Sequence, residues 1–321
     1  MRIRPAGILI AALLVGIAVY WVGLRDRPSA PTPSKPPRGA HVGERSVATS
    51  GAESQRLPSV EAPLRLTIST LIAQADQGNA EAACRLALEY QKCDLVEQQL
   101  MQLDDVTARQ GVDDALQTVS ISRESSSFFA GTEHCEGVQP AEPGRVAVLL
   151  RQSALGGNPA AMRAYATGAA FSTDSMVDDA EELRTYKSLG PQIAKLAIER
   201  GDGTVLLSLA AAYQPENHQG ARPLLAQAVS TDITEALALF HVARSELADQ
   251  GRMEGHLWRF VNQQLASLDV RASAAQRVES ERRAAELRGN VSQPFKLPSD
   301  NQVAFVSRAT GGNMRADECG R

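Results

Sequence analysis

Small and apolar residues recur at helical spacing in residues 71–90, and this pattern predicts two short helices folded back on each other. The first helix gathers its apolar residues on one face: Leu71, Ile72 and Ala75. The second helix does the same at intervals of three and four: Ala82, Ala83, Leu86, Ala87 and Tyr90. Gly78 can adopt the left-handed conformation that ends a helix, and Asn79 can cap the next one. Because a single hairpin leaves its apolar face uncovered, the pattern requires further copies stacked beside it.

Three later stretches repeat this hairpin pattern. Residues 150–166 turn at Gly157-Asn158, residues 193–213 turn at Gly201-Asp202, and residues 224–242 turn at Thr231-Asp232 without a glycine. The widest interval between turns lies after the first hairpin and contains an insertion, residues 94–144. Helical spacing predicts one or two helices in residues 94–122. A lack of periodicity, with glycine, proline and serine, predicts a loop over residues 123–144.

In the last part of the repeat domain, apolar residues at helical spacing predict one long helix that closes the stack. Its apolar face comprises Leu257, Trp258, Val261, Leu265 and Leu268, and Ala275, Val278 and Ala285 extend it. The arginines and glutamates of residues 271–288 indicate a solvated outer face rather than a basic binding patch. The repeat domain therefore spans residues 63–288. Residues 289–321 are rich in proline, glycine and asparagine, which predicts a disordered tail.

The N-terminal pattern differs from the rest of the chain. Residues 6–24 contain no charge, and nineteen helical residues extend about 28 Å, close to the apolar thickness of a bilayer. A cleaved signal segment is the alternative, but the apolar run is long and leads directly into Arg25-Asp26-Arg27. We therefore predict that residues 1–27 form a membrane anchor, a single-pass transmembrane helix. Six prolines in residues 28–62 predict a disordered linker: Pro28, Pro31, Pro33, Pro36, Pro37 and Pro58.

The charges that flank this segment do not decide its orientation. More basic residues follow it than precede it, which opposes export, whereas the short head and signal-like layout favour export. We expect the chain in the cytoplasmic membrane with its body in the periplasm. The net charge of −4 gives no footprint for nucleic-acid binding, and an aromatic content of 4% suits closely packed helices. The predicted fold is all-α: stacked helical hairpins, an α-solenoid, preceded by the transmembrane helix and linker.

The four cysteines predict one structural disulfide among Cys84, Cys93 and Cys135, and we favour Cys93–Cys135. If Cys84 and Cys93 lay on one continuous helix, their Cα atoms would be about 13 Å apart, too far for a bond. The alternative is that these thiols are free and buried. Cys319 lies in the predicted tail, where we expect it to be unpaired or to form an intermolecular bond.

No motif in the chain predicts catalysis. His134-Cys135-Glu136 contains the residue types of a thiol nucleophile or a metal site, but sequence neighbours rarely have the required geometry, and no second cluster has ligand spacing. The chain has no Gly-x-Ser-x-Gly, and Gly201-Asp202-Gly203 follows no strand and precedes no Lys-Ser/Thr. We therefore predict no catalytic, metal or cofactor site and no enzymatic activity.

The hairpins follow the pattern Ala-x-x-Gly-Asn/Asp-x-x-Ala-x-x-x-Leu-Ala, which resembles the Sel-one-like repeat, a relative of the tetratricopeptide repeat. The first copy carries the resemblance most fully: Ala75, Gly78, Asn79, Ala82, Leu86, Ala87 and Tyr90. The resemblance implies a right-handed superhelix that binds proteins or peptides on a concave surface, without catalysis. The expected function is therefore a scaffold or adaptor. The alternatives are a cell-envelope accessory that positions a peptidoglycan- or secretion-related enzyme, and a purely structural spacer.

Overall fold

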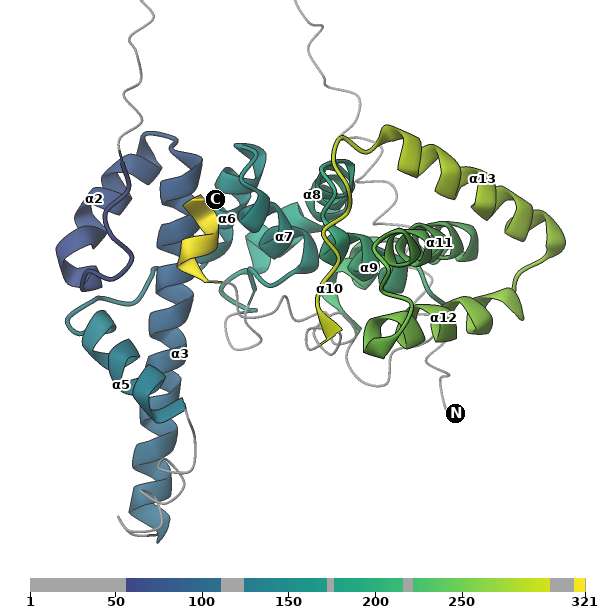
Figure 1. Ribbon diagram of the computed structural model, residues 1–321. Coiled ribbons are helices and arrows are strands. Elements are labelled where there is room, and N and C mark those ends of the chain that lie inside the picture. Colours follow the sequence, from purple (N-terminus) through teal and green to yellow (C-terminus); the bar gives the residue numbers. More distant parts are fainter. Residues whose placement is uncertain (1–55, 111–123, 172–175, 216–221, 301–314, 321) are drawn as a thin grey trace, which may run out of the picture. The chain divides into compact units, whose positions relative to one another are not determined.

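The computed structural model describes residues 56–110, 124–171, 176–215, 222–300 and 315–320, which belong to one compact unit (Figure 1). The predicted transmembrane segment, and the linker up to residue 55, lie outside the described residues. In the described part, no helix combines the length and the apolar character needed to span a bilayer.

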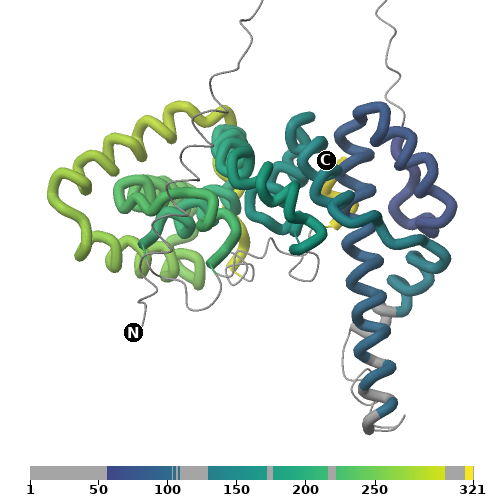
Figure 2. The backbone as a smooth tube through the Cα atoms, turned by 180° about the vertical axis from the view of Figure 1, so that it is seen from behind, coloured from purple at the N-terminus to yellow at the C-terminus, as the bar shows by residue number. Residues whose placement is uncertain are grey.

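Each of the four predicted hairpins forms two helices. The pairs are α2 (Leu64–Asp76) with α3 (Ala80–Gln110), α6 (Arg145–Leu155) with α7 (Pro159–Thr167), α8 (Ala180–Glu199) with α9 (Gly203–Ala212), and α10 (Leu224–Ala228) with α11 (Ile233–Asp249). Successive hairpins pack on one another: α3 packs on α6, α7 on α8, and α9 on α11 (Figure 2). Among the described residues the fold is all-helical apart from one isolated bridge between Asp202 and Lys296. The all-α prediction is confirmed.

The first three turns share one local structure. In each, the glycine has a positive φ: 86° at Gly78, 87° at Gly157 and 80° at Gly201. The next residue caps the following helix, and its side-chain oxygen accepts from a backbone amide two or three positions on: Asn79 from Ala82, Asn158 from Ala161, and Asp202 from Thr204 and Val205. Asp232 caps α11 in the same way without a preceding glycine. Glycine and Asn/Asp are required here by backbone geometry and capping.

Two of these glycines provide a matched pair of substitutions. A Cβ added at Gly78 would meet no atom within 4 Å, whereas one at Gly201 would lie 2.8 Å from the backbone oxygen of Gln293. Gly78→Ala is expected to lower the free energy of unfolding by about 1 kcal/mol, the strain of a left-handed alanine. Gly201→Ala is expected to cost about 1–3 kcal/mol more, because the backbone must shift. Urea unfolding measures both values, and equal losses would contradict the packing against Gln293.

The insertion departs from the prediction in two ways. The second helix of the first hairpin continues unbroken to Gln110, because no glycine or proline interrupts residues 80–110. The predicted loop over residues 123–144 is wrong for its first half, since Glu124–Cys135 forms α5. Because α3 contacts α6 directly, the chain between them leaves the succession of hairpins, and α5 packs instead on α3 and α2 (Figure 1).

The predicted single closing helix is also wrong: two helices, α12 (Gly255–Asp269) and α13 (Ala274–Asn290), stand in its place. Ser273 begins the second helix with a capping box, exchanging hydrogen bonds with Gln276. This new start changes which residues face inward. On α13, Ser280 and Ala284 are buried, whereas Val278 is 69% exposed, and α13 packs on α11.

Parts of the predicted disordered tail are ordered. Lys296 donates its amide to the Gly201 carbonyl at 2.8 Å, its own carbonyl accepts from Gly203, and Phe295 is buried. Ala316–Gly320 forms a short 3₁₀ helix, η2, packed on α3 and α7. Residues 295–297 bind the Gly201 turn through backbone groups, so the side-chain composition of this part of the tail gives little sign of its order.

Candidate functional site

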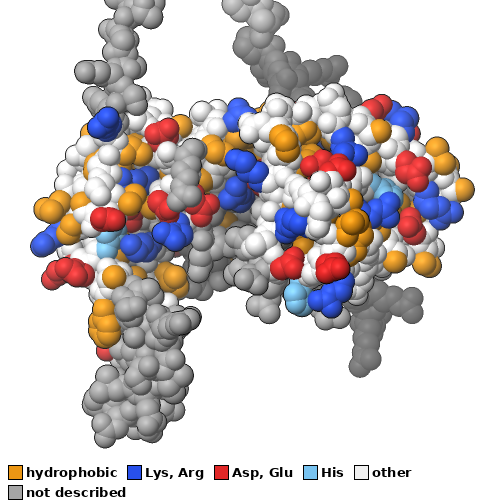
Figure 3. Space-filling view, in the orientation of Figure 1, with side chains coloured by type: hydrophobic (Ala, Val, Ile, Leu, Met, Phe, Trp, Pro, Cys, Tyr) orange, Lys and Arg blue, Asp and Glu red, His pale blue; other side chains and the backbone are white. Residues whose placement is uncertain are grey.

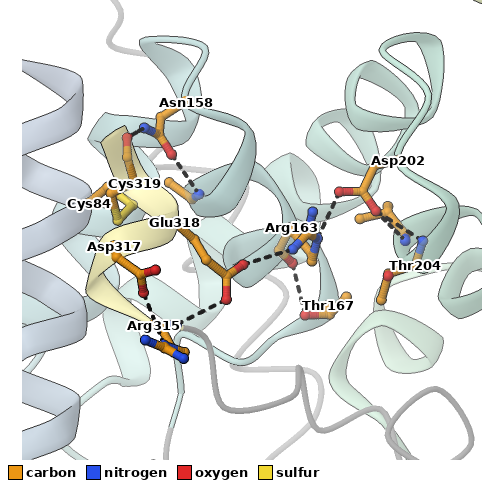
Figure 4. Close-up of polar contacts among 12 residues, drawn as sticks. Cys84, Asn158, Arg163, Thr167, Asp202, Thr204, Arg315, Asp317, Glu318 and Cys319 are labelled. Atoms are coloured by element: carbon orange, nitrogen blue, oxygen red, sulfur yellow. Dashed lines mark hydrogen bonds and ion pairs between the residues drawn. A yellow bond between two sulfur atoms is a disulfide. The ribbon is translucent and has the colours of Figure 1, made fainter. Parts of the chain in front are cut away.

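The C-terminal segment is held on α3 and α7 by a disulfide between Cys84 and Cys319 (Figure 4). The expectation that Cys319 is unpaired or intermolecular is therefore wrong. Cys84, a disulfide candidate in the sequence, does not pair within the first hairpin or the insertion. Its partner lies 235 residues away. Both cysteines are buried, at 0% and 1% exposure. No local sequence pattern links residues this far apart.

Polar contacts reinforce this attachment and involve two of the turn residues. The Asn158 side chain donates its amide to the Cys319 carbonyl at 2.7 Å while its oxygen caps α7. Arg163 bridges Asp202, at 2.8 Å, and Glu318, at 3.2 Å (Figure 4). The surface formed here by α3 and α7 is thus filled by the chain itself. It does not offer an open binding site.

An open groove lies instead between α3 and α5. A second disulfide joins Cys93 on α3 to Cys135 at the end of α5, which is the pairing that the sequence favoured. Together with residues after α5, the two helices line an open cavity of about 530 Å³. This groove is our candidate functional site. It lies at the junction of the first hairpin and the insertion, where the chain leaves the regular succession of hairpins.

Packing beneath the groove holds α5 close to α3. A Cβ added at Gly131 would lie 3.0 Å from a methyl group of Val96, so glycine permits this approach. Next along α5, the buried His134 ring places Nε2 2.7 Å from a carboxylate oxygen of the buried Glu89. Glu89 is also 3.6 Å from the buried Arg85. The disulfide and this polar contact fix the C-terminal end of α5 against α3.

Four carboxylates line the groove, one pair on each wall. Asp94 and Glu97 lie one helical turn apart on α3, and Glu133 and Glu136 lie at and just beyond the end of α5. Among the described lining residues there is no lysine or arginine. Burial, and then the charge of Glu97, raise the pKa of the Asp94 carboxyl above its usual range.

The floor and rim of the groove carry apolar side chains. Val96 and Val138 lie in the floor, and Leu100 lines the cavity while remaining 37% exposed. Two further large apolar side chains on these helices, Met101 and Phe129, are more exposed still. Figure 3 shows acidic and apolar side chains next to each other at the α3–α5 end of the molecule. Large contiguous apolar patches on a protein surface mark interaction sites.

The three residues that the sequence singles out for possible chemistry make separate contacts in the groove. His134, Cys135 and Glu136 do not act as a unit: His134 contacts Glu89, Cys135 is in a disulfide and Glu136 lines the cavity. In the described part of the chain, no group of three His, Cys, Asp or Glu side chains could hold a metal ion. Cys93 and Cys135 are bonded to each other and join the end of α5 to α3. We therefore interpret this disulfide as a structural support for the groove.

The two disulfides should differ in their access to reductant. Cys93 and Cys135 are partly exposed and line the cavity, whereas Cys84 and Cys319 are buried. Brief treatment of the native chain with dithiothreitol is expected to reduce Cys93–Cys135 first. Alkylation followed by mass spectrometry should find label on Cys93 and Cys135 alone, with Cys84 and Cys319 labelled only after denaturation. Labelling of Cys319 first would contradict the buried attachment of η2.

Comparison with known proteins yields no relative: no protein-family model, no curated protein and no solved structure matches this chain. The resemblance to the Sel-one-like repeat therefore stays a prediction.

Sequence reasoning found the cysteine pair of the groove but missed its second wall. Residues 123–144 carry no helical periodicity, so α5, with Glu133 and the buried His134, was expected to be a loop. One available signal was the charge pattern, since Asp94 and Glu97 on α3 face no basic residue one turn away. No local sequence pattern indicates the contact between His134 and Glu89, because 45 residues separate them.

Proposed function

We propose that this chain is a membrane-anchored helical-repeat adaptor of the Sel-one-like kind, facing the periplasm, that binds a protein or peptide partner in the α3–α5 groove. The observation that carries the proposal is the groove itself. It is open, has an apolar floor and is supported by a disulfide, and its carboxylates form no ion pair with another described residue. A preformed surface with exposed apolar side chains binds a partner with little ordering cost.

Two further observations support a position at the membrane with the folded unit in the periplasm. All four cysteines of the chain are paired, and disulfides persist in oxidising compartments outside the cytoplasm. The uncharged residues 6–24 supply the anchor, and the proline-rich residues that follow hold the folded unit away from the bilayer. The succession of helical hairpins, with Gly-Asn and Gly-Asp turns, supports the solenoid assignment.

Co-purification with matched surface variants tests the proposal. Leu100→Arg places a long cationic side chain in the acidic groove, and Val278→Arg places the same side chain on the exposed face of α13. The full chain is expressed in its native cells and isolated from membranes without reductant. The same defined partner should accompany the wild type and Val278→Arg but not Leu100→Arg. An identical set of proteins with all three, or no partner with any of them, would reject the groove and favour a structural spacer.

A further inference from the structure

We infer that the partner of the α3–α5 groove is a cationic amphipathic segment, with apolar side chains that enter the groove and Lys or Arg side chains that pair with both of its walls. This inference rests on the proposed function and adds the chemistry of the partner. It concerns only the lining of the groove, since the surface of α3 and α7 is already occupied by η2.

The first argument is uncompensated charge. No ion pair joins Asp94, Glu97, Glu133 or Glu136 to another described residue. Elsewhere on the protein acidic groups commonly have basic partners, as in the Arg163–Asp202 contact. Four carboxylates around one cavity repel one another, and a bound cation relieves that repulsion. The groove is therefore complementary to positive charge on two opposite sides.

One basic side chain near the groove is already paired and does not compensate this charge. Arg145 lies near one end of the groove, where its charge acts on the hydroxyl of Tyr90. Its guanidinium pairs with Asp76 at 2.8 Å. Burial raises the pKa of the Tyr90 hydroxyl, so this residue stays neutral and offers no charge of its own at neutral pH. The site thus keeps its negative potential.

The second argument is the apolar floor between the charged walls. The disulfide, Val96, Val138 and Leu100 line a cavity of about 530 Å³, within the range of sites that enclose side chains of a ligand. A uniformly basic segment would leave these groups uncovered, and a uniformly apolar one would bury carboxylates without partners, which is unfavourable. A helix or turn that presents both apolar and basic side chains can cover the apolar floor and pair with the carboxylates of the walls.

Synthetic peptides provide the test. Three fluorescently labelled peptides of fourteen residues share the same leucine positions at helical spacing and carry Lys, Ser or Glu at every polar position. Each is titrated against the purified, non-reduced full chain by fluorescence anisotropy. The Lys peptide is expected to bind at least tenfold more tightly than the Ser peptide, and the Glu peptide to bind weakest. Raising the salt concentration from 50 to 500 mM should remove most of that advantage, since exposed charge pairs are screened.

Paired substitutions locate the charge effect. Asp94→Asn with Glu97→Gln removes one wall and should weaken the Lys peptide about tenfold while leaving the Ser peptide unchanged. The matched control removes two exposed acidic residues at the same spacing near the start of α8, Asp178→Asn with Glu181→Gln, and should change neither peptide. Because the raised pKa of Asp94 means that its charge is unfavourable in the folded state, Asp94→Asn should not lower the melting temperature. Loss of binding can then be separated from loss of folding.

Failure of this inference and failure of the proposed function give different results. Equal binding of the Lys and Ser peptides, lost in both with Leu100→Arg, would overturn the cationic partner while keeping the groove as a binding site. An unchanged Lys affinity in the Asp94/Glu97 variant would place the cationic site elsewhere and overturn the inference. If Leu100→Arg also leaves native co-purification intact, the proposed function fails with it.

Discussion

Cys319→Ser is expected to lower the free energy of unfolding by about 4–5 kcal/mol. The bond to Cys84 joins residues 235 positions apart, so it restricts the unfolded chain across most of the folded unit. The substitution also releases η2, with its contacts to Asn158 and Arg163. Cys84 is left as a buried thiol, which behaves as a small apolar group and adds little further penalty.

The second disulfide is the control for this prediction. Cys93 and Cys135 are separated by 42 residues, and the same chain-entropy estimate gives a loss smaller by about 1.5 kcal/mol for a Cys93→Ser, Cys135→Ser variant. Guanidinium unfolding of the non-reduced proteins, followed by circular dichroism, measures both values. A Cys319→Ser protein as stable as the wild type would show that η2 contributes nothing to the fold.

Arg85→Ala is the second substitution expected to have a large effect, about 3–5 kcal/mol. Arg85 and Glu89 are 2% and 1% exposed, so removing the guanidinium leaves a buried carboxylate without its cation. The guanidinium also donates to the carbonyl oxygens of Pro58, and of Ser59 at 2.7 Å, and so attaches the segment that precedes α2. Those oxygens lose a buried donor in the variant.

Arg145→Ala is the matched control. Arg145 also pairs with an acidic side chain, Asp76, but the two are 32% and 58% exposed. Solvent screens this pair, and its loss should cost less than about 1 kcal/mol. Thermal unfolding monitored by circular dichroism separates the two outcomes. Equal effects would mean that Arg85 is solvated in solution and that the contact with Glu89 is not buried.

The hairpins could be predicted because local rules determine them. The turns at Gly78, Gly157 and Gly201 each require a positive φ and a capping side chain, and both requirements are visible in the sequence. The Cys93–Cys135 pairing could be predicted because Cys84 and Cys93, on one continuous helix, are too far apart for a disulfide.

The remaining features depend on contacts between distant residues. α5 lacks periodicity and is positioned by Gly131 against Val96 and by His134 against Glu89. The break before α13 depends on one capping box at Ser273, a signal easily lost within an otherwise helical pattern. Cys319 joins the fold through the buried Cys84, which gives no pattern in its own neighbourhood. The candidate site was therefore half predictable: its α3 wall follows from the sequence, and its α5 wall does not.

Site-specific photo-crosslinking tests the central claim, that a partner binds between α3 and α5. A photoreactive phenylalanine analogue replaces Leu100 in one full-length variant and Val278, on α13, in another, and both are irradiated in intact cells. We expect one discrete adduct from position 100 that is absent from position 278, and its crosslinked partner peptide should carry Lys or Arg beside apolar residues. Adducts from position 278 with none from position 100 would contradict it.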